Sequence, residues 1–205
     1  LENARAAAPD RIDLSMELAR TYEAVGKDTE AGALYTKLLA PPTDAATVDV
    51  PLELRVHAGL FFVRMRKFAE AGEQGKAIIK ADHENATGHY LAGESALAAG
   101  NLEDARREFI EAVSFERTAR HLDAAGRANE SIALSKKDMA MQDAAIRAYQ
   151  DAIKLDPKMF SSQLGLGRLY VTRKEMEKAV IPLLEANKIK ANDPEVSFNL
   201  GAAYI

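Results

Sequence analysis

The residues most able to do chemistry are four histidines, but their spacing gives little support to a metal site. They are His57, His83, His89 and His121. His83 is followed by Glu84 and then, six positions after His83, by His89. Two histidines that ligate one metal from a single helix lie four residues apart, so that both rings share a face. A spacing of six does not meet that requirement, and we predict no metal site.

Other catalytic patterns are missing from the sequence. Gly165-Leu166-Gly167 lacks the third glycine and the preceding strand of a dinucleotide-binding loop. No Gly-x-Ser-x-Gly motif and no phosphate-binding lysine loop occurs. With no cysteine, thiolate catalysis, disulfides and cysteine-ligated metals are excluded. We therefore predict that the chain is not an enzyme and needs no cofactor.

Charge and hydropathy argue against two further classes of partner, nucleic acids and membranes. The chain has 27 Lys and Arg against 31 Asp and Glu, a net charge of −4, and so lacks the basic excess typical of nucleic-acid binding. The sequence contains no run of 18 or more apolar residues, so we predict no membrane insertion by this segment. The absence of cysteine is compatible with the cytoplasm and with a bacterial periplasm, and leaves the localisation unknown.

A regular repeat of small residues is the main structural signal. The small residues fall 40, 34, 40, 34 and 34 positions apart, at Ala19, Gly59, Gly93, Ala133, Gly167 and Gly201. Each of the first five begins the same order of residue types, which in the fifth instance reads Gly167, Tyr170, Ala179, Leu183, Ala186. Small residues let two helix axes approach, and bulky residues of the next helix fill the space beside them.

Each period contains two amphipathic helices. In the first, apolar residues at helical spacing run from Ile12 to Val25 and again from Ala31 to Leu39. Gly26-Lys27-Asp28 separates them as a short turn, so the two helices must be antiparallel neighbours. One such hairpin cannot bury its own apolar face and needs the next hairpin to cover it.

This order strongly resembles the tetratricopeptide repeat (TPR) family, which has a 34-residue helix–turn–helix unit. The run Ala145-Tyr149-Ala152-Leu155-Asp156-Pro157 is nearly the consensus, and five instances in register cover almost the whole chain. The resemblance implies an all-α fold, a right-handed superhelical solenoid of antiparallel helix-turn-helix hairpins.

The period predicts five hairpins with a partial repeat at each end. The hairpins span about 12–45, 52–85, 86–119, 120–159 and 160–193. Residues 1–11 are interpreted as the end of a preceding repeat's second helix, because Ala4 stands five before Pro9 as Ala152 does before Pro157. Residues 194–205 are interpreted as the first helix of a truncated sixth repeat. We expect the chain to be part of a longer array.

Two intervals carry six extra residues each. The first extra segment lies in Pro41–Pro51, where proline and threonine predict a loop between repeats. The second lies near Glu116–Gly126, a stretch of good helix formers without a turn residue. We expect it to lengthen the first helix of the fourth hairpin at its start.

In TPR proteins the first helices line the concave face, where partners usually bind. Helical spacing places an apolar patch of the second and third hairpins toward that groove: Val56, Leu60, Val63, Tyr90 and Leu97. Arg64 and Glu94 are predicted to set the orientation of a bound segment, and Glu130 of the fourth hairpin is predicted to be exposed on the same face. The groove is mixed in sign, unlike a receptor for a purely acidic tail or for phosphate.

These features predict a non-catalytic protein–protein interaction scaffold that binds a peptide or helix of a partner in the concave groove. Two alternatives stay open at this stage. One is a structural TPR module of a bacterial envelope or secretion assembly, and the other is a regulatory arm of a larger enzyme or transcription regulator. The partner and the oligomeric state are not predicted.

Overall fold

The computed structural model describes residues 11–40 and 50–204, and this part of the chain is all-α, with no strand. Its eleven helices are α2 (Ile12–Ala24), α3 (Asp28–Leu39), α4 (Leu52–Arg64), α5 (Phe68–Ala81), α6 (Ala86–Ala98), α7 (Leu102–Phe115), α8 (Ala119–Lys136), α9 (Met139–Leu155), α10 (Phe160–Thr172), α11 (Met176–Ile189) and α12 (Pro194–Ala203). The predicted fold class is confirmed. Within the described ranges, no helix is long and apolar enough to span a bilayer.

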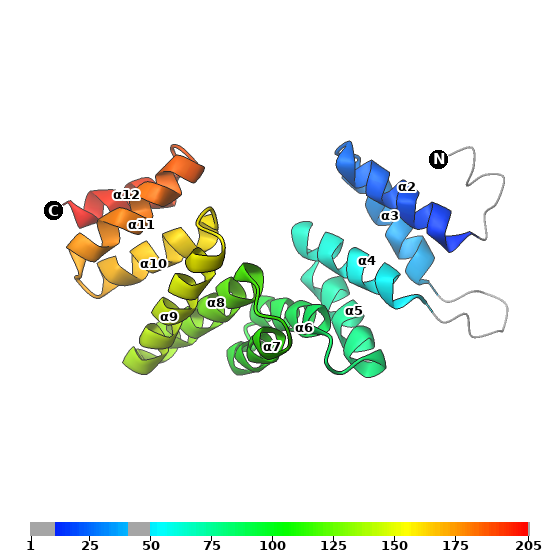
Figure 1. Ribbon diagram of the computed structural model, residues 1–205, viewed down its shortest axis with the longest axis horizontal. Helices are drawn as coiled ribbons and strands as arrows, with labels where there is room; N and C mark the ends of the chain where they lie inside the picture. Colours follow the sequence, from blue (N-terminus) through cyan, green and yellow to red (C-terminus); the bar gives the residue numbers. More distant parts are fainter. Residues whose placement is uncertain (1–10, 41–49, 205) are drawn as a thin grey trace.

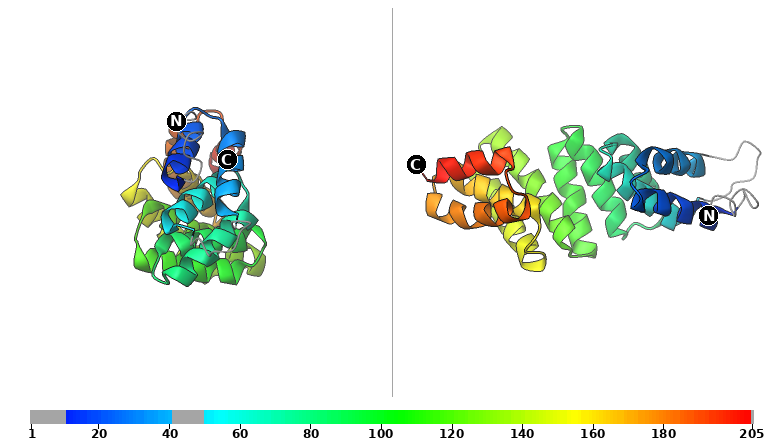
Figure 2. Two further views of the ribbon diagram at one scale, coloured as in Figure 1. Left: turned by 90° about the vertical axis from the view of Figure 1, so that its right-hand side faces the viewer. Right: turned by 90° about the horizontal axis from the view of Figure 1, so that it is seen from above.

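The helices stack in chain order along one axis, with the first and last hairpins at opposite ends (Figure 1 and Figure 2). Each helix packs mainly on its neighbours in the sequence. Among the described residues, the first helices α4, α6, α8, α10 and α12 also contact one another in succession, while the second helices make no comparably close contacts. The stack is curved, as Figure 1 shows. Elements on the inside of a curved stack approach each other, so the first helices line its concave, inner face.

The small residues of the repeat lie where neighbouring helices meet. A Cβ added at Gly93 would lie 2.5 Å from the Phe109 ring, and one at Gly167 would lie 2.4 Å from Leu183 Cγ. In both hairpins the bulky residue therefore occupies the space that the missing side chain leaves, as the pattern predicted. At Gly75 the neighbouring atoms are backbone and not side chain, because its Cβ would lie 2.7 Å from two backbone atoms of α6.

The turns inside the hairpins share a left-handed residue. It follows the small residue by seven positions at Gly26, Arg66, Gly100 and Lys174. In the fourth hairpin it is Lys137, only four positions after Ala133. This turn comes three residues early, and α9 is correspondingly longer than the other second helices, with 17 residues against 14 in α5.

The second six-residue insertion lengthens α8, as predicted. This helix has 18 residues, whereas α4 and α6 have 13 each, and it begins 14 positions before Ala133 instead of the usual seven. Thr118 caps it by accepting a hydrogen bond from the backbone N–H of His121 at 3.2 Å. The predicted helix end in residues 1–11 lies outside the described residues apart from Arg11, as does the predicted loop at Pro41–Pro51 apart from Val50 and Pro51.

Candidate functional site

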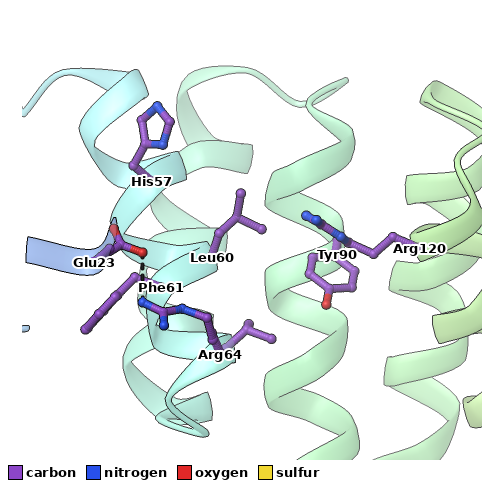
Figure 3. A pocket seen from close by; sticks show the side chains of 8 residues that line it. Glu23, His57, Leu60, Phe61, Arg64, Tyr90 and Arg120 are labelled. Atoms are coloured by element: carbon purple, nitrogen blue, oxygen red, sulfur yellow. Dashed lines mark hydrogen bonds and ion pairs between the residues drawn. The ribbon is translucent and has the colours of Figure 1, made fainter. Parts of the chain in front are cut away.

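A cavity of about 370 Å³ opens between the first helices of the inner face (Figure 3). Helix α2 contributes one lining residue, α4 five, α6 one and α8 one. They are Glu23, His57, Leu60, Phe61, Val63, Arg64, Tyr90 and Arg120. Four elements from four successive hairpins thus converge on one site, and only stacking of the repeats brings them together.

The apolar wall of the cavity consists of Leu60 and Val63 on α4 and the ring of Tyr90 on α6. The two aliphatic side chains are half-buried and pack on the core, so their outward surface is held in place. The Tyr90 ring lies 5.6 Å from the His121 ring and 6.2 Å from the Phe109 ring, between centroids. Burial, and then the nearby Glu94 carboxylate, raises the pKa of Tyr90, which is therefore neutral at physiological pH.

The positive charge of Arg64 in the cavity wall is neutralised by carboxylates of the first hairpin. Arg64 donates to Glu23 Oε2 at 2.9 Å and lies 3.0 Å from Asp28 Oδ1. The other oxygen of Glu23 accepts a hydrogen bond of 2.6 Å from the hydroxyl of Tyr35. Arg64 also lies over the Phe61 ring, 5.2 Å from its centroid. These contacts fix Arg64 and Glu23 against the first hairpin and leave them little freedom to reorient toward a ligand.

The second arginine of the wall, Arg120, has no ion-pair partner among the described residues, unlike Arg64. Arg120 is exposed and comes from the first turn of the lengthened α8. Its guanidinium lies 5.8 Å from the centroid of the Tyr90 ring. No hydrogen bond or ion pair joins it to any residue in the described part of the chain. Sequence reasoning located the insertion that carries Arg120 but did not connect it with the groove, because the helix start is distant in sequence from the patch.

The structure brings together four of the seven predicted site residues. Leu60, Val63, Arg64 and Tyr90 line the cavity. Val56 and Leu97 instead pack half-buried against the hydrophobic core and are not part of its wall. The cavity also includes His57, Phe61 and Arg120, which the sequence patch did not contain. Helical spacing gives the face of a residue but not how far the next hairpin covers it.

The expected exposure of Tyr90 and Glu94 is wrong. Tyr90 is 7% exposed and Glu94 is 5% exposed, because α8 packs beside α6 and covers that face. Glu94 forms an ion pair with Arg127 on α8, which also contacts Asp123 at 3.2 Å. The Glu94 carboxylate is therefore occupied by the protein itself.

The Glu94–Arg127 pair is one step of a ladder of ion pairs between successive first helices. In each step the residue just after the small position of one hairpin pairs with the residue six positions before the small position of the next hairpin. The pairs are Arg20–Glu53, Glu94–Arg127 and Arg168–Glu195. The two intervening steps have leucine at the first position, namely Leu60 and Leu134. The inner face thus alternates neutralised charge pairs with aliphatic steps, and the cavity lies at the Leu60 step.

Glu130 corrects a further expectation, since it is buried and not exposed. Arg168 donates to its two carboxylate oxygens from Nε and Nη2, both at 2.7 Å, and the Tyr149 hydroxyl donates at 2.7 Å. Burial and the adjacent Glu130 raise the pKa of Tyr149 well above its usual value. The repeat pattern missed this because a glutamate at a first-helix position does not reveal its partners on α9 and α10.

The histidines singled out in the sequence make protein contacts. His89 shares a hydrogen bond with Glu108 Oε2 at 2.8 Å through Nδ1 and one with the His83 carbonyl at 2.9 Å through Nε2. In the described ranges, no three His, Asp or Glu side chains converge as they would around a metal ion.

Comparison with known proteins relates this geometry to a family. Residues 58–117 and 143–204 match one tetratricopeptide repeat profile, and residues 126–159 match another. No curated protein sequence gives a significant match.

Among solved structures, the hetero-tetramer Cut9–Hcn1 of the APC/C aligns with 100% of this chain at a TM-score of 0.79 and 16% identity, and the chain covers 38% of that protein. TTC0263, a thermophilic TPR protein of Thermus thermophilus, aligns over 94% of this chain and 98% of its own, with a TM-score of 0.67 and 18% identity. YrrB, described as a TPR protein with an unusual peptide-binding site, aligns over 96% of this chain and 95% of its own, with a TM-score of 0.60 and 18% identity. At these identities the likeness shows the shared fold.

Proposed function

The chain belongs to the tetratricopeptide repeat family, and on that premise we propose that it is a protein-interaction scaffold that holds a partner's peptide segment in the cavity of its inner face. The observation that carries this proposal is the cavity itself, where an apolar wall of Leu60, Val63 and Tyr90 meets charged groups from three helices. A concave site with an apolar surface and a few placed polar groups is the usual form of a binding site.

The site is suited to binding with little loss of receptor freedom. Arg64 forms ion pairs with two carboxylates of the first hairpin, and Tyr90 contacts the rings of Phe109 and His121. Side chains that are ordered before binding do not lose their rotamer entropy when a ligand arrives, so more of the contact free energy appears as affinity. The peptide-binding site of YrrB, a protein of the same fold, is a further reason to favour a peptide ligand.

The test is a selection of random linear 12-residue peptides displayed on phage, using the whole chain as target. Leu60→Asp places a charge on the apolar wall, and we expect selected peptides to lose at least about tenfold in affinity, the effect of roughly 1.4 kcal/mol. The matched control is Ile181→Asp on α11, because Ile181 is 70% exposed and lies outside the cavity.

Circular dichroism of both variants checks that the helices persist. Peptides that bind the wild-type chain and Ile181→Asp but not Leu60→Asp support the proposal. A selection that yields no binder, or binders with equal affinity for Leu60→Asp, would reject it.

A further inference from the structure

The insertion that lengthens α8 has a consequence for the cavity. Helix α8 has 18 residues where α4 and α6 have 13, and the added turns at its start extend beside α6. Arg120 lies in these turns and reaches the wall opposite Leu60, as Figure 3 shows. Without the insertion, the cavity would lack its α8 contribution, so the extra residues complete the site.

Arg120 is the part of the wall that offers unused hydrogen-bonding capacity. Its guanidinium lies over the Tyr90 ring, and in the described part of the chain no hydrogen bond uses its N–H groups. In the described ranges no carboxylate pairs with it, whereas Arg64 is paired with Glu23 and Asp28. A planar guanidinium that contacts an aromatic ring and has unused N–H donors matches the planar geometry of a carboxylate.

The charges around the cavity leave a positive excess. The acid in its wall is Glu23, and both of its oxygens already accept hydrogen bonds, from Tyr35 and from Arg64. His57 lies against Arg20 and within 3.5 Å of Glu53. Arg120 therefore remains as the uncompensated charge, next to the apolar surface of Leu60 and Val63.

We propose that Arg120 binds the carboxylate of an aspartate or glutamate side chain in a partner peptide, while an adjacent apolar residue of the peptide packs against Leu60 and Val63. This inference rests on the proposed function, since it names the chemistry of the peptide. We assign the carboxylate to a side chain because the inner face continues past α8 along α10 and α12, which gives a peptide that reaches Arg120 room to extend beyond it (Figure 1). One acidic anchor is sufficient, since two other charged residues of the cavity wall, Glu23 and Arg64, pair with each other.

The experiment uses two matched sets of synthetic 12-residue peptides, acetylated and amidated at their ends. Each member of the first set places leucine or phenylalanine next to glutamate, and its counterpart has glutamine in place of that glutamate. Fluorescence polarisation measures binding to the whole chain. The wild-type chain should favour the glutamate member by about tenfold at low salt, and the preference should shrink as salt is added because the pair is partly solvated.

Arg120→Gln should abolish this preference while leaving the affinity for glutamine peptides unchanged. Arg120→Glu should reverse it, disfavouring glutamate peptides relative to glutamine ones. The control Arg147→Gln removes an exposed arginine of α9 outside this cavity and should leave the preference intact. Because Arg120 and Arg147 are both exposed, neither change should alter the circular dichroism spectrum.

The results separate this inference from the function on which it rests. If the wild-type chain binds both sets equally, and both bindings are lost in Leu60→Asp, the inference about Arg120 is wrong and the peptide-binding function stands. If no peptide binding depends on Leu60, both fail. A free C-terminal acid in place of the amide, added as a separate arm, should not substitute for the missing glutamate. If it restores tenfold tighter binding that depends on Arg120, the side-chain assignment is overturned.

Discussion

Gly75→Ala should destabilise the protein even though alanine is the better helix former. Gly75 lies in the middle of α5, where the backbone of α6 packs directly against it. The added Cβ would lie 2.7 Å from the Gly88 carbonyl oxygen, 2.7 Å from the Ala92 nitrogen and 3.0 Å from Leu91 Cβ. The first two are backbone atoms that no rotamer change can move, so the two helices must separate.

The magnitude follows from two opposing effects. Overpacking a well-filled interface costs about 1–3 kcal/mol, and replacing glycine by alanine inside a helix gains about 1 kcal/mol. Because the contact is with backbone, the cost lies toward the upper end of that range. The free energy of unfolding should therefore fall by about 1–2 kcal/mol.

The matched control is Gly201→Ala in α12, where a Cβ would meet nothing within 4 Å. Its free energy of unfolding should rise by up to about 1 kcal/mol, because alanine has the higher helix propensity and causes no overpacking there. Urea denaturation followed by circular dichroism gives both values. Hydrogen exchange should also quicken more in α5 and α6 of Gly75→Ala than in α10 and α11, since each repeat contacts only its neighbours. If Gly75→Ala is as stable as Gly201→Ala, the close approach of α5 and α6 is wrong.

Three further predictions concern buried polar groups and caps. Glu130→Ala should lower the free energy of unfolding by about 2–3 kcal/mol in urea denaturation, because the Tyr149 hydroxyl and Arg168 lose their buried acceptor; an effect below that of an exposed glutamate would contradict the network. Asp138→Ala should cost about 1 kcal/mol in thermal denaturation, because its carboxylate caps α9 by accepting from two backbone N–H groups. Burial raises the pKa of Tyr90 and Tyr149 above the ordinary value of 10.0, so the stability they contribute is complete below pH 10 and is lost as the pH rises beyond it. Phenolate absorbance at 295 nm should show these two tyrosines ionising only as the helices unfold, and ionisation at pH 10 with the helices intact would contradict their burial.

Much of the fold was predictable because its unit is local. The spacing of Gly93, Gly167 and their bulky partners is a property of one hairpin, and the structure shows Phe109 and Leu183 in the predicted contacts. The lengthened start of α8 was also predictable, since a stretch without turn residues continues a helix. The early turn at Lys137 was not, because several residues there tolerate either helix or turn and packing of α8 on α9 decides between them.

The candidate site was only partly predictable, because helical spacing gives the face on which a residue lies but not its burial or its ion-pair partners. Helical spacing placed Leu60, Val63, Arg64 and Tyr90 on one face, and the structure gathers them around one cavity. The same spacing predicted that Glu94 and Glu130 are exposed. In the structure both are buried and form ion pairs with arginines of the next first helix.

The sequence by itself determined the repeat, the hairpins and the face on which each side chain stands, because these depend on residues within about 34 positions of one another. Only the tertiary structure decided which charges are satisfied and which are free. That depends on the curvature of the stack, which brings Arg127 to Glu94 and Arg120 to the Tyr90 ring. Curvature is set by how every hairpin packs on the next, and no single repeat contains that information.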